Sequence, residues 1–221
     1  MTASGMTAAG IVAELQSLAN PANVAGMARF GISSQGTLGV SVAEVRRIAR
    51  RAGRSHDLAL ELWASGIHEA RILATIVDEP ARVTRAQMDR WARHFDSWDV
   101  CDQACQNLFW RTEHAWPMVE KWSNARGEFV RRAAFALIAR LAGKQKDTPE
   151  ERWEEAFRLI VEAAGDERNF VRKAVNWALR EIGRRSPELR VRAIATAKEI
   201  RRIDSKAARW IAADALRELE S

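Results

Sequence analysis

Trp98 and Asp102 stand four residues apart in the segment 96-DSWDVCDQACQNLFW-110. On an α-helix, residues at this spacing differ by only about 40° around the axis, so the indole and the carboxylate share one face while Asp99 turns away. The face of an indole attracts a cation, and a carboxylate attracts one through its charge. The pair therefore suits a cationic ligand.

One column of an internal alignment contains three cations and this carboxylate: Arg71 of 71-RILATIV-77, Asp102 of 102-DQACQNL-108, Arg132 of 132-RAAFALI-138 and Lys173 of 173-KAVNWAL-179. On the concave side of a helical solenoid, such a column forms a basic stripe that follows a phosphate backbone. Trp177 follows Lys173 by four residues, so it adds a second indole beside the same predicted stripe. Because a carboxylate repels phosphate, Asp102 needs either a structural partner, such as Arg132, or a chemical use.

The elements that must position these residues are helices, because apolar residues recur at helical spacing almost throughout the chain. The motifs 84-TRAQ-87 and 148-TPEE-151 predict helix starts, with Pro149 at the first helical position. The segment 129-FVRRAAFALIARLAG-143 resembles 170-FVRKAVNWALREIGR-184 at an offset of 41, and 177-WALRE-181 echoes 214-DALRE-218 at 37. This period predicts an all-α solenoid of HEAT-like repeats, forming one curved domain over residues 1–221 with a basic concave face.

Charge favours a polyanionic partner, with nucleic acid first. The 221 residues contain 35 Lys and Arg against 29 Asp and Glu, a net charge of +6, and the pI is near 10.0. Most of the cations are arginines, and many are paired, as at Arg131 and Arg132. The guanidinium fork matches two phosphate oxygens, although a solvated helix face explains any single pair equally well.

The remaining sequence features predict a cytoplasmic protein without cofactors. The N-terminus lacks the basic start and apolar run of a signal peptide, and no uncharged apolar stretch of 18 residues occurs. Cys101 and Cys105 lie four apart in a predicted helix, so we interpret them as reduced packing residues. The four histidines are scattered, which argues against a metal site. We expect a monomer.

Over about residues 25 to 185, the chain resembles the DNA alkylation repair family, the HEAT-like-repeat alkylpurine DNA glycosylases of the AlkD type. The resemblance rests on 27-MARF-30, 97-SWDVCD-102, 132-RAA-134 and 173-KAVNWALRE-181, in the family's order. It implies that Trp98, Asp102, Arg132 and Trp177 surround the lesion. Two positions depart from the family: Ser97 stands where a second tryptophan is common, and Phe30 stands where a tyrosine is common.

The resemblance implies hydrolytic removal of N3- or N7-alkylated purines, such as 3-methyladenine and 7-methylguanine, from double-stranded DNA. We expect Asp102, Trp98, Trp177 and Arg132 to act in catalysis, and further residues to bind DNA: Arg71, Arg131, Arg172, Lys173 and Phe30. Two other classes stay open at this point. One is a HEAT-like protein that binds DNA without catalysis, and the other is a protein-interaction scaffold.

Overall fold

The computed structural model describes residues 6–221, so the expectation about the extreme N-terminus lies partly outside the described residues. Within this range the secondary structure is helical, with thirteen α-helices, two short 3-10 helices and no strand. Packing divides the chain into two compact units, residues 1–113 and 114–221. The expectation of a single domain over 1–221 stays a prediction.

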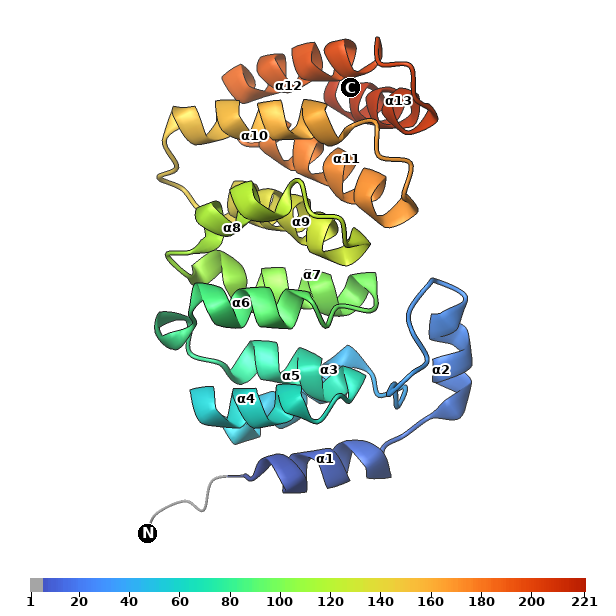
Figure 1. Ribbon diagram of the computed structural model, residues 1–221, viewed down its shortest axis with the longest axis vertical. Coiled ribbons are helices and arrows are strands. Elements are labelled where there is room, and N and C mark those ends of the chain that lie inside the picture. Colours follow the sequence, from blue (N-terminus) through green and yellow to red (C-terminus); the bar gives the residue numbers. More distant parts are fainter. Residues whose placement is uncertain (1–5) are drawn as a thin grey trace. The chain divides into compact units, whose positions relative to one another are not determined.

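The first unit contains seven α-helices and both 3-10 helices within its described residues (Figure 1). Helix α5 is central to it, since α5 packs against α3, α4 and α7. Helix α2 has no fully buried residue, although Val24 and Met27 are half-buried. The elements are α1 (Ala8–Ser17), α2 (Pro21–Ala28), α3 (Val42–Ala52), α4 (His56–Ala64), α5 (His68–Val77), η1 (Pro80–Arg82), α6 (Arg85–Ala92), α7 (Trp98–Asn107) and η2 (Phe109–Arg111).

The second unit contains six helices, which follow one another as pairs joined by short turns (Figure 1). Helices α9, α11 and α13 begin at residues 128, 169 and 206, which reproduces the offsets of 41 and 37 found in the sequence. The equivalent rings of Phe129 and Phe170 lie 5.5 Å apart, as expected of stacked repeats. The elements are α8 (Ala115–Trp122), α9 (Glu128–Lys144), α10 (Glu150–Ala163), α11 (Asn169–Gly183), α12 (Pro187–Ile200) and α13 (Lys206–Leu219).

Of the two predicted helix starts, one is confirmed and the other is wrong by one residue. The Thr84 hydroxyl accepts a hydrogen bond from the Gln87 backbone N–H at 3.2 Å, as a capping residue does. Helix α10, however, begins at Glu150, and Pro149 is the residue before it, with extended backbone and no capping hydrogen bond. Because proline lacks an N–H and has a fixed φ, it tolerates either position.

Candidate functional site

A cavity of about 670 Å³ in the first unit brings together three of the predicted site residues, Phe30, Trp98 and Asp102. One wall is α2 and the residues that follow it, a second is the segment 39–42, and a third is α7. The lining residues are Ala22, Asn23, Gly26, Met27, Phe30, Ile32, Gly39, Val40, Ser41, Val42, Trp98, Asp99, Asp102, Gln103 and Gln106. Both charged residues in this lining are carboxylates, so the cavity favours a cation or a neutral apolar group.

Trp98 links α7 to the end of α2. Its indole N–H donates a hydrogen bond to the Phe30 backbone carbonyl at 3.0 Å, and the indole itself is half-buried. The Phe30 side chain is 73% exposed, so an aromatic ring projects beside the cavity mouth. The preceding residue, Ser97, is fully buried, so the position where the family often has a second tryptophan offers no exposed surface here.

Asp102 lies in the second turn of α7 and is only 8% exposed, and it lines the same cavity as Trp98. The two residues therefore line one cavity, as side chains on one helix face would. Asp99 also lines the cavity, although helical geometry predicted that it turns away. The Asp99 carboxylate also contacts His68 at the start of α5.

His68 is a residue that sequence reasoning missed. Its Nε2 lies 2.8 Å from the Asp99 carboxylate, and the ring is almost fully buried. Burial lowers the pKa of His68, but the hydrogen bond and the charge of Asp99 outweigh this effect. The charges of Glu69 and Asp96 add to the rise, so the pKa lies above its ordinary value. No spacing in the sequence links positions 68 and 99.

The His68–Asp99 pair predicts a pH-dependent stability. Because folding raises the His68 pKa, the protonated ring stabilises the folded state fully below the unfolded pKa, and this stabilisation is lost as pH rises through the folded pKa. We expect His68→Gln to lower the free energy of unfolding by about 1 to 3 kcal/mol near pH 6 and by less near pH 9. Asp99→Asn should reduce the same pH dependence. Denaturant unfolding at both pH values measures it, and an equal loss at both would contradict the pairing.

In the second unit, the side chains of Arg131 and Arg132 make intramolecular polar contacts. Arg132, in α9, is 6% exposed, and its guanidinium donates to the Phe170 carbonyl of α11 at 2.7 Å. Arg131 lies 2.9 Å from the Asp166 carboxylate. Burial raises the pKa of Asp166, but the hydrogen bonds from Arg168 and the charges of Arg168 and Arg131 outweigh burial and lower it. Both arginines therefore tie one repeat to the next. The sequence predicts a role toward DNA for both, but it does not predict these links between repeats.

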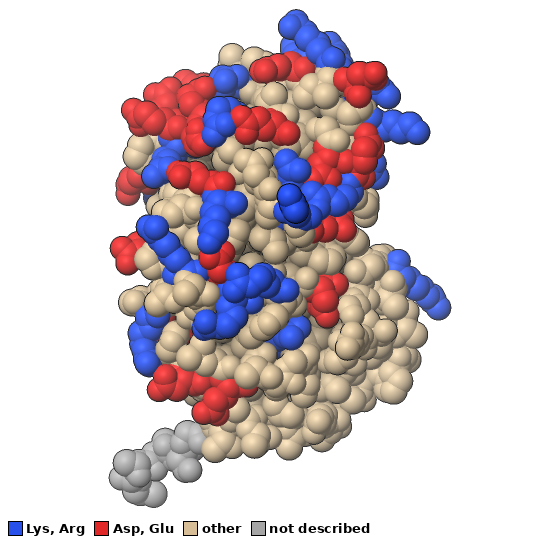
Figure 2. Space-filling model, viewed as in Figure 1, with Lys and Arg blue, Asp and Glu red and all other residues tan. Residues whose placement is uncertain are grey.

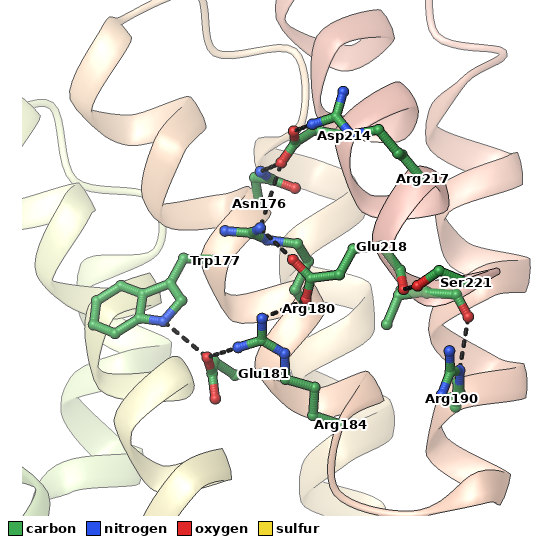
Figure 3. Close-up of polar contacts among 11 residues, drawn as sticks. Asn176, Trp177, Arg180, Glu181, Arg184, Arg190, Asp214, Arg217, Glu218 and Ser221 are labelled. Atoms are coloured by element: carbon green, nitrogen blue, oxygen red, sulfur yellow. Dashed lines mark hydrogen bonds and ion pairs between the residues drawn. The ribbon is translucent and has the colours of Figure 1, made fainter.

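Trp177 is held in α11 by a chain of polar contacts (Figure 3). Its indole N–H donates to the Glu181 carboxylate at 3.3 Å, and Arg184 lies 2.6 Å from the same carboxylate oxygen. Arg184 also lies 2.6 Å from Glu218 of α13. The half-buried indole is thus oriented through side chains of the next repeat, as Figure 3 shows.

The other predicted DNA-binding residues differ in exposure. Lys173 is exposed and is therefore accessible to a phosphate. Arg172 lies over the Trp210 ring at 5.1 Å, and Arg71 lies over the Trp63 ring at 5.6 Å. The four residues of the predicted column do occupy equivalent positions near the starts of α5, α7, α9 and α11, but they are not uniformly open to solvent, because packing buries Asp102 and Arg132.

Within residues 6–221, no group of three or more His, Cys, Asp or Glu side chains is placed to hold a metal ion. Cys101 and Cys105 are both buried in α7, as predicted for packing residues. None of the helices in the described part of the chain is long and apolar enough to cross a membrane.

Comparisons with known proteins agree with this architecture. A solved structure described as a new family of proteins related to the HEAT-like repeat DNA glycosylases, with affinity for branched DNA structures, matches with a TM-score of 0.80 at 19% identity, covering 96% of this chain and 95% of that one. The uncharacterized protein Lin0241 of Listeria innocua is 22% identical over 194 residues, covering 86% of this chain and 84% of its own. The predicted all-α fold of HEAT-like repeats is confirmed. The family model for the DNA alkylation repair enzyme matches residues 11–219. The chain therefore belongs to the DNA alkylation repair enzyme family.

Proposed function

We propose that this protein is a DNA glycosylase that hydrolyses the N-glycosidic bond of N3- and N7-alkylated purines, such as 3-methyladenine and 7-methylguanine, in double-stranded DNA. The observation that carries the proposal is the cavity of the first unit, which Asp102 and Trp98 line together and which contains no positively charged residue. Family membership supports a role in DNA alkylation repair.

The chemistry of the lesion fits such a cavity. Alkylation at N3 or N7 makes the purine cationic, so the base leaves as a neutral molecule and needs no general acid. As the bond between C1′ and the base nitrogen breaks, its electron pair goes to the base and positive charge develops on the sugar. The Asp102 carboxylate stabilises this charge and orients a water molecule, whose oxygen bonds to C1′ as the carboxylate accepts its proton.

The remaining predicted residues act as contacts to the substrate in this proposal. The faces of Trp98 and Trp177 each contribute about 0.5 to 2 kcal/mol to binding of the cationic nucleotide, depending on desolvation. Lys173, Arg172 and Arg71 contact DNA phosphates. The reaction as written needs no cofactor, and we keep the predictions of a monomer, of one domain over residues 1–221 and of a cytoplasmic location.

Base release from methylated duplex DNA tests the proposal directly. Chromatography should detect free 3-methyladenine and 7-methylguanine, with the strands left uncut until the abasic sites are treated with alkali. Binding to the duplex should weaken as salt rises, since phosphate contacts release counterions. Absence of released base at protein concentrations that saturate the duplex would contradict the proposal.

A second function, binding of branched DNA without catalysis, is favoured by the surface around α2. Residues 15–43 contain a single charged side chain, Arg29, and Figure 2 shows an uncharged expanse over this part of the first unit. The exposed Phe30 ring offers a stacking face for an unpaired base at a junction. The structural relative with affinity for branched DNA shares this fold. Tighter binding to a four-way junction than to a duplex, with no base release from either, would identify this second function.

Replacing Trp177 by alanine should slow base release about 2- to 30-fold, because its indole face no longer contacts the cationic lesion. The melting temperature and the helical circular dichroism signal should stay near wild type, since the indole is half-buried. Trp116→Ala is a matched control, because Trp116 is also half-buried in the second unit and also donates to a single side chain, Gln145. A large loss of stability in the Trp177 variant would instead identify a packing residue.

A further inference from the structure

Glu69, in the first turn of α5, is a buried carboxylate surrounded by backbone N–H groups. It is 1% exposed, and it accepts hydrogen bonds from Leu38 at 3.0 and 3.1 Å, from Gly39 at 2.7 Å and from Val40 at 3.2 Å. Among residues 6–221, no Lys or Arg lies within ion-pair distance of it. A buried carboxylate is costly without compensation, so these amide donors stabilise its charge.

The segment that Glu69 holds is also tied to α2. The Leu38 carbonyl accepts from the Asn20 backbone N–H at 2.7 Å, and the Gly39 carbonyl accepts from the Asn23 side chain at 2.9 Å. Gly39 has a φ of +78°, and a Cβ there would lie 2.3 Å from the Asn20 backbone oxygen. The backbones of the segment and α2 are therefore in direct contact, and a shift of one displaces the other.

The same segment forms a wall of the cavity that contains Asp102. Gly39 and Val40 line it on one side, and Asn23 of α2 lines it beside them. Helix α2 has no fully buried residue, and two polar links add to its contacts with the rest of the unit. One is the hydrogen bond from Trp98 to the Phe30 carbonyl. The other runs from α2 to segment 38–40, whose backbone N–H groups donate to Glu69.

We propose that Glu69 is a positioning residue, which fixes segment 38–40 and through it α2, and so sets the width of the cavity opposite Asp102. This inference rests on the proposed function. Glu69 touches neither the lesion nor the water. Its role is to keep the uncharged wall close enough for the alkylated base to lie against Trp98 and Asp102.

Glu69→Gln tests the proposal, because the amide keeps the shape but loses the charge and presents an N–H₂ group to backbone donors. The concentration of enzyme giving half-maximal single-turnover base release should rise about tenfold, with a smaller change in the maximal rate and unchanged affinity for unmodified duplex. Amide hydrogen exchange should accelerate in residues 38–40 and in α2, but not in α13.

Glu79→Gln is the matched control, since Glu79 also accepts a backbone N–H, from His56 at 3.0 Å, but lies outside the cavity lining. Asn23→Ala is a milder second variant that breaks the same connection from the side of α2, and it keeps the test valid if Glu69→Gln fails to fold. The proposal would be overturned if a folded variant of Glu69 or Asn23 kept two wild-type properties. These are the rate of amide hydrogen exchange in α2 and the enzyme concentration that gives half-maximal base release. If the wild-type protein releases no base, the exchange measurement alone decides the role of Glu69.

Discussion

Asp102→Asn is expected to reduce release of 3-methyladenine and 7-methylguanine by about 100- to 1000-fold, while binding to duplex DNA is preserved or tightened. The substitution is nearly isosteric but neutral. The sugar cation loses its counter-charge, and the water loses the group that orients it. Removal of a negative charge from a surface that faces phosphates also relieves repulsion, so affinity and rate should change in opposite directions. Filter binding and single-turnover excision on one methylated duplex measure the two quantities.

The competing interpretation of Asp102 makes the opposite prediction for affinity. If this carboxylate only neutralises a cation within the fold, Asp102→Asn should destabilise the protein and weaken DNA binding. Asp96→Asn is a suitable control, because Asp96 is exposed, lies near the start of the same helix and does not line the cavity. Wild-type excision by the Asp102 variant would remove this residue from the mechanism.

Arg132→Glu is expected to lower the free energy of unfolding by about 3 to 5 kcal/mol, because it places an unpaired carboxylate in a buried position beside a backbone carbonyl. The wild-type guanidinium donates to the Phe170 carbonyl and is 6% exposed. We also expect weaker duplex binding than after reversal of Arg126, whose side chain is exposed. Denaturant unfolding and salt-dependent binding of the two variants separate these effects.

Arg126→Glu should leave stability within about 0.5 kcal/mol of wild type, as is usual for an exposed substitution. Equal stability of the two reversed variants would contradict the structural role of Arg132. Equal duplex affinity, measured at a temperature where both are folded, would argue against a DNA contact by Arg132.

The helical repeats and the spacing of Trp98 and Asp102 could be predicted from the sequence. Both depend on local periodicity: apolar residues at helical spacing predict the helices, offsets of 41 and 37 predict the repeat, and a spacing of four places two side chains on one face. The starts of α9, α11 and α13 confirm the repeat, and Trp98 and Asp102 line one cavity. The Pro149 error is a boundary effect, because proline suits the residue before a helix as well as its first position.

The burial of the polar groups and their contacts could not be predicted in the same way, because they depend on how distant segments pack. Glu69 and His68 adjoin in sequence, yet one binds the backbone at residues 38–40 and the other binds Asp99. Arg132 matched Lys173 in the alignment, but it is buried against Phe170 while Lys173 is exposed. A charged side chain has no periodic signature for burial, because its cost is offset by partners that chain folding brings from distant positions.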